Sequence, residues 1–474
     1  MASIIEKAQN IANEFALPEG FLDEAVDWFV EQAKTGLEKP TDRGLPMIPA
    51  FVTSVPSGKE KGTFLAIDLG GTNFRVCSIT LNGDSTFSIL QEKEAIPDSL
   101  MKSTSKVFIS HLVDRIEKFL RKHHCDKLEH ARKQDGTVTK EFKLGFTFSF
   151  PVNQTAINRG TLIRWTKGYD IKDMVGKDVV VLVQDEIDER RLPVHIAALV
   201  NDTVGTLMSR AYTKPTGGQT LIGCIFGTGT NGAYSEKVSH IPKFTATHPN
   251  YLETATSKIM LVNTEWGSFD NDLKVLPNTR YDIQVNLNSP NPNYHMFEKR
   301  VSGMFLGELL RLCLVELFEA GDIFVAEKDS FNLDALFTPW SLDTSVPSLI
   351  DGDGSTDLIK TAEVLKKHLG LHATTLEERQ AVQLLSKAIG RRSAHLSSIP
   401  CAGLILHTHA MRKFDIIDIG ADGSVVEFYP NFRPMMHEAL SSITKIGVEG
   451  NAKIHIGNAK DGSGIGAALC ALMG

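Results

Sequence analysis

The stretch Asp68-Leu69-Gly70-Gly71-Thr72-Asn73 lies between an apolar run, 64–67, and a run rich in β-branched residues, 74–81. This arrangement predicts a strand, a tight turn and a returning strand. Glycines let backbone N–H groups approach phosphate oxygens closely, and a threonine hydroxyl adds a further donor. The stretch therefore favours a phosphate-binding hairpin, although a Gly-Gly turn taken alone is more often an ordinary hairpin.

A second turn of the same kind, Gly227-Thr228-Gly229-Thr230-Asn231, follows the apolar run 221–226. The chain contains no G-x-x-x-x-G-K-[ST] motif, so neither turn is a Walker-type phosphate loop. Two glycine-threonine turns, each directly after an apolar strand, predict the two sides of one phosphate site. Their recurrence also hints at two structurally similar halves, although the likeness falls short of a sequence repeat.

Length, charge and cysteine content set the class of protein. A chain of 474 residues exceeds the size at which one core keeps growing, so we expect two domains. The net charge of −7 argues against a nucleic-acid partner. The six cysteines form no C-x-x-C pair, which is typical of a reduced cytoplasmic protein. The chain has no secretory signal at its start and no apolar run of about 18 residues, so no membrane span is expected.

Hydrophobic periodicity predicts a mixture of helices and strands. Helical spacing covers the first forty residues and then recurs at 105–122, 300–335, 357–397 and 464–472. Strands are expected as a three-stranded meander over 64–95, as single strands at 144–150, 179–183, 195–200, 221–226 and 453–456, and as a strand–turn–strand unit over 416–428. This alternation predicts an α/β fold.

Asp202 is a candidate general base. It follows the apolar strand 195–200 in the sequence Asn201-Asp202-Thr203, and an aspartate at the mouth of a buried strand is partly desolvated, which raises its proton affinity. The alternative is structural, because Asp202 or Thr203 would also serve well as the N-cap of a following helix.

Several loops combine hydroxyl, ammonium and carboxylate groups with aromatic residues. Ser149-Phe150 and the segment 164–168 provide donors beside aromatic rings, and Glu265 and Glu298 provide acceptors. Such mixtures suit a polyhydroxylated ligand with an apolar ring face. Ordinary loop composition is the alternative, and Glu298 beside Lys299 could be a helix surface residue.

Two other polar patterns do not favour metal sites. The pair His407-x-His409 has no carboxylate or cysteine nearby in sequence to complete a ligand set, so a polar loop or strand edge is expected. The segment 351–357 resembles a calcium loop in composition, but Ala362 stands where the closing glutamate belongs.

Longer segments resemble the hexokinase family. Leu144-Gly-Phe-Thr-Phe-Ser-Phe-Pro151 and the segment from Asn158 to Gly168 are similar to the signature of that family. The two glycine turns are similar to its two phosphate motifs, and 418–424 resembles its adenosine motif. Within the family, the stretches 226–232, 297–308 and 459–464 are most similar to the fungal glucokinase branch.

The resemblance implies a two-lobed actin-like ATPase (ribonuclease H-like) fold, with a central mixed sheet in each lobe and a cleft between them. The small lobe would comprise 66–200 plus 457–474, and the large lobe 1–65 plus 201–456. The implied activity is transfer of the ATP γ-phosphoryl group to the 6-hydroxyl of glucose. A broad-specificity hexokinase and a non-catalytic sugar sensor remain alternatives. A monomer or homodimer is expected.

The resemblance also implies the roles of individual residues. Asp202 would be the general base, Lys167 would face the transferring phosphoryl group, and Asp68 would hold Mg²⁺ through water. One departure is Lys460, because some relatives carry an acidic residue there. The implied sugar site comprises Ser149, Phe150, Thr166, Lys167, Asn201, Asp202, Asn231, Glu265 and Glu298. The implied ATP site comprises Asp68, Gly70, Gly71, Thr72, Asn73, Arg75, Gly227, Thr228, Gly229, Gly420, Gly423, Ser424 and Gly464.

Overall fold

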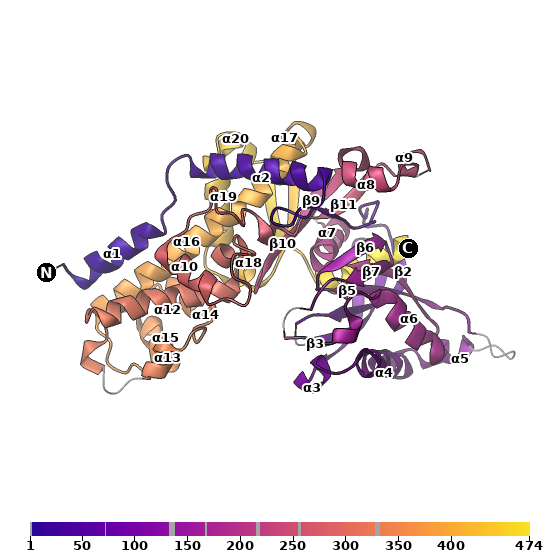
Figure 1. The fold of residues 1–474 in the computed structure, drawn as a ribbon, viewed down its shortest axis with the longest axis horizontal. Helices are drawn as coiled ribbons and strands as arrows, with labels where there is room; N and C mark the ends of the chain where they lie inside the picture. The colour runs from indigo at the N-terminus through magenta and orange to yellow at the C-terminus, as the bar shows by residue number, and fades with distance from the viewer. Residues whose placement is uncertain are drawn as a thin grey trace.

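The structure is a computed structural model of the chain. It describes residues 2–71, 73–131, 138–165, 168–214, 219–254, 257–327 and 332–474. Within these ranges the molecule has two lobes that lie side by side, each with its own β-sheet (Figure 1). No helix across the described ranges has the length and apolar character needed to cross a membrane.

The first lobe is built on a sheet with the strand order β4-β3-β2-β5-β8 in the described residues. Strands β2, β3 and β4 form an antiparallel meander, and β5 and β8 continue the sheet in parallel with β2. A separate hairpin, β6–β7, lies beside it. The strands span Lys61–Leu69 (β2), Asn73–Asn82 (β3), Phe87–Ala95 (β4), Phe142–Phe148 (β5), Val152–Ala156 (β6), Arg159–Leu162 (β7) and Val194–Val200 (β8).

The second lobe repeats this plan. Its sheet has the order β1-β11-β10-β9-β12-β13, in which β9, β10 and β11 form an antiparallel meander. Strands β12 and β13 then run parallel to β9, as β5 and β8 do to β2. The strands span Ile48–Pro49 (β1), Gln219–Phe226 (β9), Thr230–Lys237 (β10), Ile259–Asn263 (β11), Ile417–Asp422 (β12) and Ile454–Asn458 (β13).

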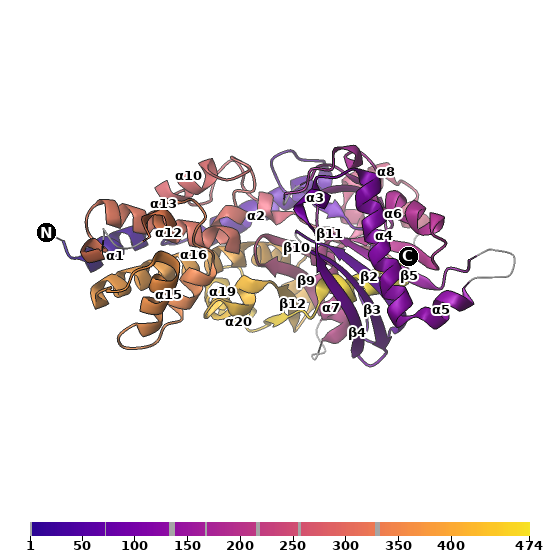
Figure 2. The same cartoon turned by 90° about the horizontal axis from the view of Figure 1, so that it is seen from below.

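Most of the helices belong to the second lobe, which extends toward the N-terminus (Figure 2). The longest described helix, α16, is buried along much of its length. The helices of the first lobe are α3 (Asp98–Met101), α4 (Ser105–His123), α5 (Cys125–His130), α6 (Val179–Glu189) and α21 (Ala467–Met473), which packs on the first sheet. The others are α1 (Ile4–Glu14), α2 (Phe21–Glu38), α7 (Asp202–Thr213), α8 (Pro242–Thr247), α9 (Tyr251–Thr254), α10 (Arg280–Leu287), α11 (Glu298–Val301), α12 (Gly303–Glu319), α13 (Leu333–Phe337), α14 (Ser345–Asp351), α15 (Ile359–Leu369), α16 (Leu376–His407), α17 (Ala410–Lys413), α18 (Ser424–Phe428), α19 (Phe432–Ser442) and α20 (Gly447–Asn451).

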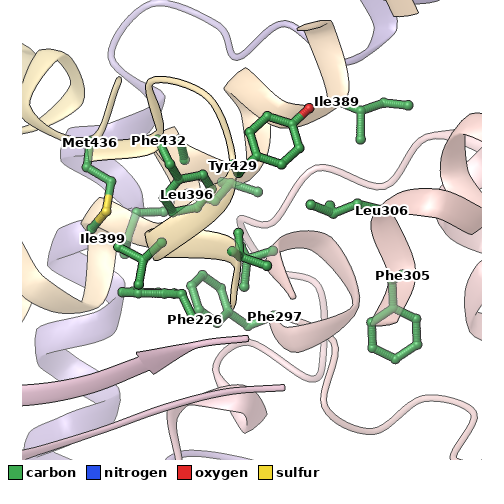
Figure 3. Packing of buried hydrophobic residues seen from close by; sticks show 14 of the residues in the cluster. Phe226, Phe297, Phe305, Leu306, Ile389, Leu396, Ile399, Tyr429, Phe432 and Met436 are labelled. Atoms are coloured by element: carbon green, nitrogen blue, oxygen red, sulfur yellow. The ribbon is translucent and has the colours of Figure 1, made fainter. Parts of the chain in front are cut away.

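Successive side chains of β2 point to opposite faces of the first sheet, and both faces are buried. Leu65 and Ile67 face a core formed with α4 and α6, whereas Phe64 and Ala66 face a core formed with α7 and α21. The second lobe has the largest core, in which Phe226 at the end of β9 packs with Phe297, Leu396 and Phe432 (Figure 3).

Helix α7 lies between the two sheets and is held in place by close backbone contacts at glycines. A Cβ atom added to Gly205 would overlap the carbonyl of Gly462, and one added to Gly466 would overlap the backbone of Gly205. At the other end of α7, the buried Arg210 donates to Asp418 at 2.6 Å. Burial raises the pKa of Asp418, but the hydrogen bond and charge of Arg210 outweigh it and hold the pKa below its usual range.

The α/β class and the mixed sheets expected from the sequence are confirmed, but two expected strands are wrong. Residues 179–183 begin helix α6, because the Asp178 carboxylate accepts the N–H groups of Val180 at 2.9 Å and Val181 at 3.2 Å. The second half of the 416–428 unit is helix α18, which starts after Gly423 turns the chain at φ 109°. The lobe boundaries 66–200 plus 457–474 stay a prediction.

The calcium-like segment around Asp353 is a turn held by its own hydrogen bonds. The buried Asp353 carboxylate accepts the N–H and hydroxyl groups of both Ser355 and Thr361, at distances from 2.6 to 3.0 Å. Burial raises the pKa of Asp353, but these hydrogen bonds outweigh it and lower the pKa to about 2.

Asp353→Asn is expected to lower the free energy of unfolding by about 1–3 kcal/mol at pH 7. The folded-state pKa lies below the unfolded value of about 3.9, so this stabilisation is present above pH 4 and is lost as the pH falls toward 2. Urea unfolding at several pH values measures the difference in free energy of unfolding between wild type and Asp353→Asn. Asp357→Asn, at an exposed position, is the control. A difference between wild type and Asp353→Asn that stays constant down to pH 3 would contradict the assignment.

Gly466→Ala is expected to lower the free energy of unfolding by about 1–3 kcal/mol or more, because its methyl group would overlap the backbone of Gly205. Gly354→Ala is the matched control, since nothing lies within 4 Å of its added Cβ. Urea denaturation of both variants measures the difference. Equal stability of the two variants would show that α7 does not need this close approach.

Candidate active site

Three neighbouring parallel strands carry the predicted polar residues of the first lobe to one edge of the sheet. Strand β5 lies between β2 and β8, with Leu69 paired to Phe148 and Thr147 paired to Val200. The segments that follow these strands contain Gly70-Gly71, Ser149-Phe150 and Asn201-Asp202. Carboxyl ends of adjacent parallel strands are where ligands bind in open α/β sheets.

Asp202 is the first residue of α7, and the sequence-based assignment of Asp202 or Thr203 as N-cap is wrong. The cap is Asn201, whose Oδ1 accepts the Thr203 N–H at 2.9 Å and the Thr203 hydroxyl at 2.6 Å. The Asp202 carboxylate is half-buried, and its Oδ2 accepts the Ser149 hydroxyl at 3.4 Å. Asn201 thus keeps its amide N–H groups as donors, while Asp202 presents a carboxylate at a helix N-terminus, which stabilises negative charge.

Glu265 belongs to a cluster on the second sheet. Its Oε1 accepts Nδ2 of Asn263 at 2.8 Å and Nδ2 of Asn231 at 3.2 Å. Asn231 also donates to Asn263 Oδ1 at 2.9 Å and accepts the Gly232 N–H at 2.7 Å. Glu265 itself has the left-handed φ of 53°, a strained conformation for a residue with a Cβ. The carboxylate is therefore fixed, with its second oxygen able to accept from a ligand.

Glu298 is fixed by the turn between β9 and β10. It begins α11 with a side chain that is 21% exposed, so it is not an ordinary helix surface residue. Its Oε2 accepts the Thr230 N–H at 3.0 Å, and its Oε1 lies 3.3 Å from Nδ1 of His295. A Cβ added to Gly229 would lie 2.7 Å from Glu298 Oε2, so the glycine permits this close approach. The same hairpin thus holds both Glu265 and Glu298.

The second glycine turn also meets the adenosine-like segment. The turn is closed by a hydrogen bond from Gly227 N to Gly229 O at 3.0 Å, and Gly303 N donates to Gly227 O at 2.7 Å. A Cβ added to Gly227 would lie 3.4 Å from the Cα of Gly423. Ser424 follows as the first residue of α18. The fold therefore brings together two predicted nucleotide segments that lie far apart in sequence.

The first glycine turn is tied to the C-terminal segment through Arg75. The guanidinium donates from Nη2 to Asp461 Oδ1 and to Ser463 Oγ, both at 2.6 Å, and lies 3.6 Å from Asp68 Oδ2. Nη1 donates to Gln91 at 3.1 Å. Burial lowers the pKa of Arg75, but the bond to Asp461 and nearby negative charge raise it above its usual value. The sequence analysis assigned this guanidinium to the phosphate site. In the structure it donates hydrogen bonds to side chains of the protein itself.

The remaining predicted residues differ in their surroundings. A Cβ on Gly420 would overlap the side chain of Arg210, so this glycine makes room for α7. Gly464 lies against Asp461, whose carboxylate accepts the Gly464 N–H at 3.3 Å. The Phe150 ring is buried and packs on Phe148 at a centroid distance of 4.9 Å. Thr72, Thr166 and Lys167 lie outside the described residues.

Sequence reasoning missed the residues that fix the predicted ones in place. Asn263 donates to Glu265, and His295 contacts Glu298. Asp461 and Ser463 accept from Arg75. Asn263 directly follows the apolar run 259–262, and this position at the end of an expected strand is the one sequence signal that could have indicated it. The sequence did not favour a metal site at the pair His407-x-His409. In the structure, His407 Nε2 lies 2.8 Å from the buried Glu236 carboxylate.

Comparison with known proteins identifies the family of the chain. Residues 7–212 and 221–473 match two family models, both described as hexokinase. The chain belongs to the hexokinase family, and its enzymatic class is that of a sugar kinase.

Individual relatives match over their full length. The chain is 48% identical to the glucokinase of Aspergillus niger, covering 100% of this chain and 97% of that protein. It is 46% identical to glucokinase-1 of Saccharomyces cerevisiae, with 99% and 97% coverage. The hexokinase from Schistosoma mansoni complexed with glucose has a similar structure, with a TM-score of 0.81, 31% identity and 99% coverage of both chains.

Arg75→Met is expected to lower the free energy of unfolding by about 1.5–3 kcal/mol without any ligand, because it breaks charged hydrogen bonds to Asp461 and Ser463. An arginine devoted to phosphate would leave the ligand-free stability unchanged. Arg391→Met is the control, since its partner Glu438 is 52% exposed and such pairs contribute little. Chemical denaturation measures both, and equal small losses would contradict the role assigned to Arg75.

Proposed function

We propose that the protein phosphorylates glucose at its 6-hydroxyl, with ATP as donor and glucose 6-phosphate and ADP as products. The observation that carries this proposal is the position of Asp202, a half-buried carboxylate at the N-terminus of α7 beside Ser149. The full-length identity to proteins named glucokinase, 43–48%, supports glucose as substrate, whereas relatives named hexokinase are 37–40% identical.

The sugar would lie among donors and acceptors that the fold holds in place. The clusters of Glu265 with Asn231 and of Glu298 with Thr230 offer fixed acceptors for sugar hydroxyls. The first lobe would add donors from the loops after β5 and β7. The full proposed set is Ser149, Phe150, Thr166, Lys167, Asn201, Asp202, Asn231, Glu265 and Glu298.

Asp202 would act as the general base. Its carboxylate accepts the proton of the 6-hydroxyl while that oxygen forms a bond to the γ-phosphorus of ATP. The bond between the γ-phosphorus and the β–γ bridging oxygen breaks, and ADP leaves with the electron pair. Ser149 would orient the carboxylate through its hydrogen bond, and the Lys167 ammonium would offset the negative charge that develops on the phosphoryl oxygens.

The two glycine turns and the segment after β12 would receive the nucleotide. The full proposed set is Asp68, Gly70, Gly71, Thr72, Asn73, Arg75, Gly227, Thr228, Gly229, Gly420, Gly423, Ser424 and Gly464. Asp68 fits a Mg²⁺ ligand, because it lies at the end of β2 beside the first turn with 23% of its side chain exposed. In phosphoryl-transfer sites Mg²⁺ is held by one or two carboxylates together with water and phosphate oxygens. When bound, the ion would neutralise charge on the phosphates.

The lobe assignment and cellular setting belong to the same proposal. Sugar contacts from both lobes exist together only when the cleft is closed, so sugar binding would favour closure and exclude water from the phosphoryl group. All six cysteines are free thiols and five are buried, which supports a reducing cytoplasmic location. A monomer or homodimer is proposed.

Asp202→Asn is expected to lower kcat for glucose phosphorylation by about 10²- to 10⁴-fold, because the amide cannot accept the hydroxyl proton. Coupled detection of ADP measures the rate, with the exposed Asp185→Asn as control. Fructose and mannose tested beside glucose separate the alternatives. Fructose turnover equal to that of glucose would indicate a broad hexokinase, and glucose binding without turnover in the wild type would indicate a sensor.

A further inference from the structure

A contact between the two lobes lies beside the sugar site. The guanidinium of Arg164 lies over the ring of Tyr294, with 5.7 Å from Cζ to the ring centroid. Arg164 follows β7 in the first lobe, where Ile163 N donates to Pro151 O at 3.0 Å. Tyr294 lies in the chain segment between α10 and α11, which belong to the other lobe. A cation within about 6 Å of an aromatic face is attracted to it.

The loop that presents Tyr294 is rigidly built. The residues on either side, Asn293 and His295, have left-handed φ values of 62° and 54°. The Asn286 side chain accepts Asn293 N at 2.8 Å and donates to Asn293 Oδ1 at 2.9 Å. The buried Lys299 ammonium donates to Asn286 Oδ1 at 3.0 Å and to the carbonyl of the loop residue 291 at 2.7 Å. Strained backbone held by such bonds is a preorganised surface.

The same loop leads directly to a sugar-facing carboxylate. The Tyr294 ring stacks on the His295 ring, with centroids 4.8 Å apart and planes at 29°. His295 Nδ1 lies 3.3 Å from Glu298 Oε1. On the other side, Arg164 precedes Trp165, whose Nε1 donates to Ile171 O at 2.8 Å within the first lobe. A continuous line of contacts therefore runs from the first lobe to Glu298.

We propose that Arg164 and Tyr294 form a cross-lobe latch, a positioning pair that favours the closed cleft and, through His295, orients Glu298 toward the hexose. This inference rests on the proposed function, because the ligand it concerns is the sugar of that site. Neither residue touches the reacting atoms in this scheme. The latch acts on how readily the cleft closes, so it affects sugar affinity and not the chemical step.

A double-mutant cycle on glucose affinity tests the latch. Arg164→Ala and Tyr294→Ala are each expected to raise the glucose Kd, measured by calorimetry, by about two- to fivefold. The double variant should raise it no further, because both changes remove one contact. Tyr294→Phe should keep wild-type affinity, since the ring face remains, and kcat at saturating glucose should stay within about twofold.

Arg159→Ala is the matched control, because Arg159 is exposed on the same hairpin and bonds only locally to Asn158 O in the described residues. Additive effects of the two alanine variants, or a Tyr294→Phe variant as weak as Tyr294→Ala, would overturn the latch. So would a fall in kcat that accompanies a lower melting temperature, since that indicates structural damage.

A second readout does not depend on sugar turnover. Small-angle scattering of the ligand-free protein should give a larger radius of gyration for Arg164→Ala than for wild type and Tyr294→Phe, because the lobes separate more readily. Identical radii for all three proteins would overturn the latch. A wild type that phosphorylates no hexose, yet shows this difference in radius, would overturn the proposed function and leave the latch supported.

Discussion

The packing of helix α7 between the two sheets is the constraint on which the site depends. Backbone approaches at Gly205 and Gly466 bring the C-terminal segment against its first turns, and Gly223 allows β9 to lie under Leu207. At its last turn, Gly420 and Gly457 make room for Arg210, which neutralises the buried Asp418. A helix so closely packed between two sheets cannot tilt without breaking contacts in both lobes. Its first residue is Asp202, so the placement of the proposed base follows from these close glycine contacts.

Apart from the added edge strand β1 of the second sheet, the two sheets have the same strand order, and this explains why the glycine turns recur. In each lobe an antiparallel meander is followed by two parallel strands, and the glycine turn joins the first two strands of the meander. The turns at Gly70 and Gly227 therefore occupy equivalent places in the two halves. Sequence likeness between the halves is faint because each half packs a different set of helices, and only the backbone requirement of the turns is shared.

Local sequence predicted the sheets and the strand–turn–strand units well, since alternating apolar residues and glycine turns act over a few positions. It failed at 179–183, where four valines favour a strand but the side chain of Asp178 caps a helix. The site was predictable as a set of polar residues after apolar strands. The partner Asp461 was not, because its hydrogen bond to Arg75 joins segments 386 residues apart and depends on the finished fold. Asn263 and His295 lie two and three residues from the carboxylates that they contact, and the local backbone that brings these side chains together was not predicted. The assignment of Arg75 to phosphate stays a prediction, and its bonds to Asp461 and Ser463 are what the sequence did not indicate.

In the second lobe, the proposed sugar site is held in place by hydrogen bonds within the protein. Glu265 and Glu298 are fixed by N–H donors of β10 and β11, so their carboxylates are positioned to accept sugar hydroxyls and little ordering is required on binding. Asp202, at the start of α7, accepts the hydroxyl of Ser149 from the first lobe at 3.4 Å, so this hydrogen bond crosses from the first lobe to the proposed base. A sugar held first by the rigid carboxylates would then draw the other lobe toward itself, because only the closed arrangement completes its hydrogen bonds. For the proposed sugar site, fixed carboxylates in the second lobe therefore favour recognition of the sugar there before the cleft closes.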